Sequence, residues 1–173
     1  DVASLNYFLA LGTVALQIVT IALLCALVFR SRVATFADIG ASVAKWGLWI
    51  GFFASLAATL LALFYSDVFG FEPCYWCYRQ RIFLYPQVIL FTMALWRERY
   101  VQTAIDSSII LSVIGAGVAL YQHALQMMPG SGLPCPATGV SCAQRLFFEF
   151  GYITYPLMAF SVFAFLVVVM LFM

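Results

Sequence analysis

The chain contains five long apolar runs, each of which is long enough to cross a lipid bilayer as a helix. A spanning helix needs about 20 predominantly apolar residues, because the hydrocarbon core is about 30 Å thick. Only helices and closed barrels satisfy every backbone N–H and C=O in lipid, and the alternation of barrel strands is absent. We therefore predict an all-α, polytopic membrane helical bundle. The predicted spans are Leu5–Phe29, Trp46–Tyr65, Tyr78–Trp96, Ser107–Leu125 and Tyr152–Met173.

The first apolar run has the position of a signal peptide but not its other properties. It is longer than the apolar core of a signal peptide, which has about 7 to 15 residues, and no positively charged segment precedes it. We therefore expect this run to be retained as a span.

Charged residues are scarce, which agrees with a membrane protein. They make up 9% of the chain and hydrophobic residues 65%, whereas soluble domains have roughly 25% charged residues. The net charge is +1, and no basic run is present. We therefore expect membrane lipid around the spans, but neither nucleic acid as a partner nor a polybasic lipid-binding patch.

The distribution of basic residues predicts the orientation of the bundle. Two of the predicted connections, 30–45 and 97–106, contain most of the lysine and arginine residues and are assigned to the cytoplasm by the positive-inside rule. The other two, 66–77 and 126–151, hold four of the five cysteines and are then extracytoplasmic. We predict an extracytoplasmic N-terminus and a cytoplasmic C-terminus in the cell membrane (inner or plasma membrane). The basic residues that oppose this count are Arg79, Arg81 and Arg145.

A CxxC motif, Cys74 and Cys77, lies where an external connection becomes a membrane helix. Proline at position 73 suits the start of a helix, because the N–H that it lacks would be unsatisfied there anyway. The partial positive charge of a helix N-terminus favours a thiolate, which is the form that attacks disulfides and other electrophiles. This position predicts a reactive pair.

Arg81 has the spacing to share a helix face with both cysteines, since the three residues stand at i, i+3 and i+7. A permanent cation costs about 2.5 to 3.5 kcal/mol at the centre of a spanning helix and less near the interface. A quinone carbonyl oxygen or a thiolate would offset this cost. The alternative is that Arg79 and Arg81 both extend to the lipid headgroups.

A second pair, Cys135 and Cys142, lies in the other external connection, and proline and glycine at 129–139 predict a mobile loop. Disulfides persist outside the cytoplasm, so four external cysteines indicate two disulfide-forming pairs rather than a zinc site, and we predict no metal. Purely structural disulfides are an alternative. Cys25 stands alone in an apolar span, which predicts packing only. His123 fits either proton transfer or a simple interfacial hydrogen bond.

Residues 73–81 (PCYWCYRQR), followed by Cys135 and Cys142, resemble the DsbB/BdbC family of disulfide-bond formation proteins. The resemblance implies a four-helix thiol oxidoreductase domain over residues 46–173. Residues 1–45 depart from the family pattern. They would add an N-terminal transmembrane helix and a cytoplasmic loop, whose role is open.

The resemblance also implies a function, that of a protein-dithiol:quinone oxidoreductase. Cys135 and Cys142 would exchange disulfides with an extracytoplasmic thioredoxin-fold partner similar to DsbA or BdbD. By the same resemblance, Cys135 would form the mixed disulfide with the partner and Cys142 the transient link to Cys74. Cys77 would then reduce a membrane quinone, ubiquinone or menaquinone, that Arg81 contacts. The short spacing of the loop pair is closer to BdbC than to DsbB.

Two other functions remain open from the sequence. A vitamin K epoxide reductase-like protein also combines a helical bundle, a CxxC, loop cysteines and a quinone, but there the loop pair precedes the CxxC. A non-enzymatic membrane scaffold with disulfide-stapled loops would explain the bundle, but it would leave the CxxC at a helix start and Arg81 without a purpose.

Overall fold

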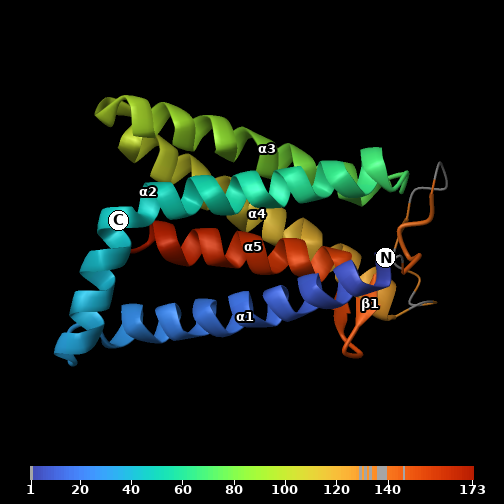
Figure 1. Cartoon of the computed structure of the whole chain (residues 1–173), viewed down its shortest axis with the longest axis horizontal. Helices are drawn as coiled ribbons and strands as arrows, with labels where there is room; N and C mark the ends of the chain where they lie inside the picture. Colours follow the sequence, from blue (N-terminus) through green and yellow to red (C-terminus); the bar gives the residue numbers. More distant parts are fainter. Residues whose placement is uncertain (1, 129, 131, 133, 136–139, 146) are drawn as a thin grey trace.

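Five α-helices run along one another in the described part of the chain (Figure 1). The computed structural model describes residues 2–128, 130, 132, 134–135, 140–145 and 147–173. The prediction of an all-α membrane bundle is confirmed. The helices are α1 (Val2–Phe29), α2 (Ala34–Leu63), α3 (Tyr75–Trp96), α4 (Val101–Met127) and α5 (Tyr155–Met170).

Two of the predicted connections are much shorter than expected. Helix α2 begins at Ala34 rather than at residue 46, so only a short turn separates it from α1. Its first turns run across the end of the bundle before the helix turns to run along it (Figure 1). Similarly, α4 begins at Val101, directly after a 3₁₀ turn, η2 (Glu98–Tyr100). The prediction of polar connections over 30–45 and 97–106 was wrong in extent, because a helix can continue beyond its apolar span.

The opposite end of the bundle, where α3 begins and α4 ends, is called the cysteine end below. Helix α2 finishes here in a π-helical segment, η1 (Phe64–Val68). A short hairpin, β1 (Phe148–Glu149) and β2 (Ile153–Thr154), precedes α5. The hairpin shortens the last predicted span, so that α5 begins at Tyr155 rather than at 152. The predicted mobile loop at 129–139 lies largely outside the described residues.

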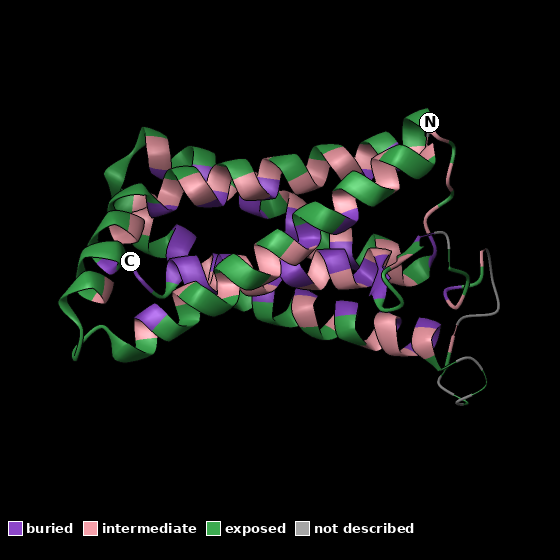
Figure 2. Ribbon diagram, turned by 60° about the horizontal axis from the view of Figure 1, so that its bottom comes forward, coloured by how far each residue is buried: buried purple, intermediate pink, exposed green. Residues whose placement is uncertain are grey.

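Apolar side chains cover the outer faces of the bundle, and buried residues gather along its inner faces (Figure 2). By length and composition, α1, α2 with η1, and α4 with η2 are each apolar enough to cross a membrane. Helix α5 is apolar but has 16 residues, and α3 carries several polar side chains. The chain is therefore a membrane protein in which α3 is the most polar helix of the bundle.

Glycine allows aromatic side chains to pack directly against helix backbones in the core. A Cβ at Gly115 of α4 would lie 2.5 Å from the Phe163 ring of α5, and one at Gly51 of α2 would lie 2.7 Å from the Phe91 ring of α3. Both rings are fully buried. The close packing of α4 on α5 and of α2 on α3 therefore requires these two glycines.

We expect Gly115→Ala to destabilise the protein by about 1–3 kcal/mol, because overpacking forces a buried ring to move. Gly117→Ala on the same helix is the matched control, since no atom lies within 4 Å of a Cβ there. At this exposed site alanine should stabilise the helix by up to about 1 kcal/mol. Thermal unfolding of both variants in detergent measures the difference. Equal midpoints would contradict the packing of Gly115 against Phe163.

Candidate redox site and apolar cavity

Cys74 is the N-cap residue of α3, and its backbone is extended (φ −71°, ψ 171°). The first turn is closed by the Tyr78 N–H, which donates to the Cys74 carbonyl oxygen at 3.1 Å. Pro73 therefore precedes the cap instead of occupying the first helical position. The predicted placement of the CxxC at the start of the helix is confirmed, with Cys74 just before the first turn and Cys77 within it.

The two sulfurs of the CxxC lie 3.0 Å apart and share one hydrogen-bond donor. The side-chain amide of Gln122 on α4 donates to the Cys74 sulfur at 3.1 Å and to the Cys77 sulfur at 3.2 Å. Its oxygen accepts from the Gln80 amide at 2.6 Å, which fixes its orientation. Hydrogen bonds to an ionised group are about twice as strong as neutral ones. Gln122 therefore stabilises a thiolate on this pair.

The pair is asymmetric. A hydrogen bond to the Cys77 sulfur, together with burial, raises the pKa of the Cys74 thiol well above its usual range. Cys74 is buried, whereas Cys77 is half-buried and lies beside Arg81. In the reduced pair, these contacts favour the protonated form of Cys74.

Gln122 is a site residue that sequence reasoning missed. Its signal was present in the sequence, because an amide within an apolar span is costly unless it is hydrogen-bonded. However, the cysteines that it contacts are 48 and 45 residues away in sequence. Only the packing of α3 against α4 brings these groups together.

The loop cysteines lie against the CxxC. Cys142 is 1% exposed and packs with Cys74 and Leu125, and Cys135 lies at the edge of this cluster. The Cys142 sulfur is within hydrogen-bonding reach of both Cys74 and Cys135, and burial raises the pKa of its thiol. All four predicted cysteines are therefore gathered at the cysteine end, with Cys142 between the other loop cysteine and the CxxC.

Gln126 attaches the loop near Cys142 to α4. Its side-chain amide donates to the carbonyl oxygens of Cys142 at 3.3 Å and Gln144 at 3.2 Å. Arg145 in turn donates to the Gln126 carbonyl oxygen at 2.7 Å. These contacts hold one end of the loop pair in place beside Cys74.

Arg81 projects from α3 towards α2. It donates to the Ala62 carbonyl oxygen at 2.8 Å, and its guanidinium lies 5.8 Å from the centre of the Tyr78 ring. Arg79 instead is exposed, stacks on the Tyr75 ring at 5.0 Å and donates to the Tyr75 hydroxyl. The two arginines therefore differ: Arg79 fits an interfacial residue, whereas Arg81 is turned into the bundle.

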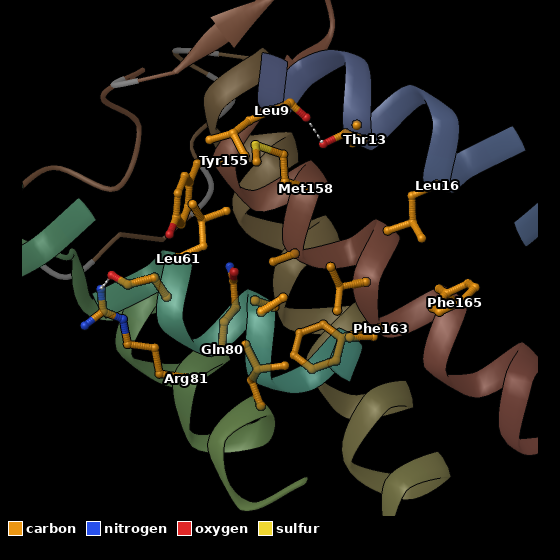
Figure 3. Close-up of a pocket in the computed structure, with 18 of the residues that line it drawn as sticks. Leu9, Thr13, Leu16, Leu61, Gln80, Arg81, Tyr155, Met158, Phe163 and Phe165 are labelled. Atoms are coloured by element: carbon orange, nitrogen blue, oxygen red, sulfur yellow. Dashed lines mark hydrogen bonds between the residues drawn. The ribbon is translucent and has the colours of Figure 1, made fainter. Parts of the chain in front are cut away.

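An apolar cavity of about 470 Å³ lies between α1, α2, α3 and α5. Cys77, Gln80 and Arg81 line it on α3, and the rest of its lining is mostly aliphatic or aromatic. Figure 3 shows Arg81 and Gln80 on one side of the cavity, with residues of α1 on the other. A cavity of this size and character suits an apolar small molecule with a few polar atoms. One sulfur of the CxxC is thus accessible to such a molecule.

The remaining candidates lie outside this site. Cys25, for which we predicted a packing role, is exposed on α1 instead of buried. His123 shares a hydrogen bond of 2.7 Å with the Thr154 hydroxyl, which fits an interfacial role. Among the described residues, no group of three or more His, Cys, Asp or Glu side chains is arranged to hold a metal ion.

Comparison with known proteins identifies the family. The model of the disulfide bond formation protein DsbB matches residues 44–173. A probable disulfide formation protein of Chlamydia pneumoniae is 36% identical over 120 residues, which is 66% of this chain and 82% of the relative. A prophage-derived disulfide bond formation protein B of Bacillus subtilis is 36% identical over 113 residues, 65% of this chain and 75% of the relative. No solved structure matches the chain.

A helical membrane bundle that gathers two cysteine pairs at one end defines a membrane protein of disulfide-bond formation. The chain belongs to the DsbB family, which confirms the predicted resemblance. The family match leaves out the first 43 residues and thus all of α1.

Proposed function

We propose that this protein reoxidises an extracytoplasmic thioredoxin-fold dithiol protein, similar to DsbA or BdbD, and passes the electrons to a membrane quinone. One observation carries the proposal: the CxxC lies between a cysteine cluster and an apolar cavity. Cys74 packs against Cys142, while Cys77 and Arg81 line the cavity. Electrons that enter through the loop cysteines therefore have a direct route to an apolar oxidant.

The relay consists of thiol–disulfide exchanges that conserve one disulfide at each step. A thiolate of the partner attacks Cys135 in the Cys135–Cys142 disulfide, which forms a mixed disulfide and frees the Cys142 thiolate. The partner's second thiol then attacks its own sulfur in the mixed disulfide, which releases the oxidised partner and leaves Cys135 as a thiol. The Cys142 thiolate next attacks Cys74 in the Cys74–Cys77 disulfide, which frees the Cys77 thiolate. Attack by Cys135 on Cys142 resolves this link and restores the loop disulfide. Two electrons and two protons then remain on Cys74 and Cys77.

The cavity residues fit a quinone. When bound, a quinone takes up two electrons and two protons and so regenerates the Cys74–Cys77 disulfide. Arg81 can donate a hydrogen bond to a carbonyl oxygen next to Cys77, and the apolar walls exclude water from a ring. Gln122 holds the Cys77 thiolate in position. Either ubiquinone or menaquinone satisfies these requirements.

The proposal includes an orientation in the cell membrane. The cysteine end faces the extracytoplasmic side, where disulfides persist, and the C-terminus lies in the cytoplasm. The basic turns that follow α1 and α3 both lie at the opposite end of the bundle (Figure 1), which agrees with the positive-inside rule. Residues 46–173 would form the oxidoreductase domain, with residues 1–45 added to it.

The direct test uses the purified protein, a reduced thioredoxin-fold substrate and added quinone. Substrate thiols are followed over time, together with the absorbance change of quinone reduction. We expect one quinone to be consumed for each disulfide formed. If substrate thiols are lost at the same rate with and without quinone, the proposed function is wrong.

Replacing Arg81 with glutamine should raise the KM for quinone by about tenfold or more, since a hydrogen bond from a charged group contributes about 1.5–3 kcal/mol. Arg79→Gln is the matched control, because Arg79 is exposed and bonded to Tyr75. Its KM should match that of the wild type. Steady-state quinone reduction gives both values. An unchanged KM in Arg81→Gln would exclude a quinone contact for Arg81.

A further inference from the structure

Helix α1 lies outside the family match, yet it forms one wall of the cavity that reaches Cys77. Leu9, Gly12, Thr13 and Leu16 line the cavity. Their spacing of i, i+3, i+4 and i+7 places them on one helix face. One wall of the cavity is therefore formed by residues that the family model does not match.

Polar contacts near both ends of this face hold α1 in place. The Tyr65 hydroxyl of η1 donates to the Asn6 side chain. Gln17 donates to the Ser161 hydroxyl of α5 at 2.9 Å and accepts from the Tyr152 hydroxyl at 3.2 Å. Between these contacts, Ala10 is fully buried. Because side-chain hydrogen bonds join helices in lipid, α1 is a fixed wall of the cavity.

The two sides of the cavity differ in polarity. On α1, Leu9, Gly12 and Leu16 have no polar side-chain atoms, and the Thr13 hydroxyl donates to the Leu9 carbonyl oxygen at 2.8 Å. On the α3 side, Cys77 and Arg81 line the cavity, and Figure 3 shows Arg81 there. A ligand that fits both sides has a polar group at α3 and a hydrocarbon part along α1.

The α1 wall also has free space and an opening. No atom lies within 4 Å of a Cβ placed on Gly12, in contrast to Gly51 and Gly115, where aromatic rings fill that space. Gly12 and Ala57 of α2 both line the cavity and are both exposed. The cavity therefore reaches the surface of the bundle where α1 and α2 approach one another, within two apolar spans.

We infer that α1 and α2 form a side channel for the isoprenoid chain of the quinone, with Gly12 keeping the channel open. This inference rests on the proposed function, because it assigns a place to the tail of the proposed oxidant. The quinone ring lies towards Arg81 and Cys77, and the first isoprene units pass Gly12 and the small side chains of α2 towards the lipid. The alanines of α2 on this wall are Ala54, Ala57, Ala58 and Ala62.

Gly12→Phe tests the inference, because its ring would occupy the open space without backbone strain. We expect the KM for a quinone with an isoprenoid tail to rise by about tenfold, since the added ring occupies the space through which the tail passes, and overpacking forces the tail or its neighbours to move. The KM for the same quinone ring without a tail should change by less than about threefold, because the ring contacts α3 and its binding area is retained. Gly117→Phe on α4 is the matched control, since its surroundings are equally open and it does not line the cavity.

The readouts separate the inference from the proposed function. If the wild type does not reduce quinone, the proposed function fails. If the wild type is active and Gly12→Phe has the same KM for the tailed quinone, or weakens both quinones equally, the channel is wrong. One round of disulfide transfer to the reduced substrate without quinone confirms that a variant is folded. If Gly12→Phe fails this check, the smaller Gly12→Leu is measured against the same two outcomes.

Discussion

Cys77→Ser is expected to reduce quinone-dependent oxidation of the thioredoxin-fold substrate to the background rate. Cys77 is the only cysteine among the described residues that lines the cavity with Arg81, and a serine hydroxyl can neither form the disulfide nor carry the thiolate. The measurement is the loss of substrate thiols in the presence of excess quinone. Cys25→Ser, an exposed position on α1, should retain full activity.

Cys77→Ser also shows whether the Cys74–Cys77 pair is a redox centre or a structural disulfide. If Cys77→Ser retained quinone-dependent turnover and lost only thermal stability, the disulfide would be a structural staple and the relay would be wrong. The CxxC closes a very small ring, so loop closure contributes little to stability. We therefore expect the unfolding midpoint of Cys77→Ser to remain close to that of the wild type while its activity is lost.

Cys142→Ser should eliminate turnover with the protein substrate but spare quinone reduction driven by a small dithiol such as dithiothreitol. Cys142 is buried against Cys74, so it is the sulfur placed to pass electrons from the loop to the CxxC. A small dithiol can reduce the Cys74–Cys77 disulfide directly and does not need the loop pair. Both rates are measured by quinone absorbance. Ser141→Ala, at the exposed neighbouring position, is the control.

The ratio of these two rates tests the order of the relay. Equal losses with the protein substrate and with the dithiol would mean that Cys142 is needed for the CxxC itself. Undiminished turnover with the protein substrate would mean that the partner reacts with Cys74 without the loop pair. Either result would contradict the proposed roles of Cys135 and Cys142.

The helices were predictable from the sequence, whereas their ends were not. Apolar runs identified all five helices, because burial in lipid requires long apolar segments. The ends depend on local backbone contacts. Thr154 caps α5 by accepting from the Leu157 N–H at 3.3 Å, and the hairpin strand before α5 takes up Ile153 and Thr154, which we had predicted to lie in the last span.

The site was predictable only where its residues are close in sequence. The placement of Cys74 and Cys77 at a helix start followed from their spacing and from the position of the connection before them. Gln122 and the α1 wall did not, because their contacts join helices that are far apart along the chain. Periodicity shows which residues of a helix share a face, but not which helix that face meets.

The opening at Gly12 and Ala57 has a consequence for the enzymology. Since both residues belong to apolar spans, the proposed channel would admit a ligand from the plane of the bilayer. For the proposed quinone, occupancy of the cavity would then depend on the mole fraction of quinone in the surrounding lipid or detergent. We therefore expect extra detergent, or empty vesicles that fuse with the sample, to slow the reaction. Both additions dilute the quinone within the apolar phase while its molar concentration stays constant.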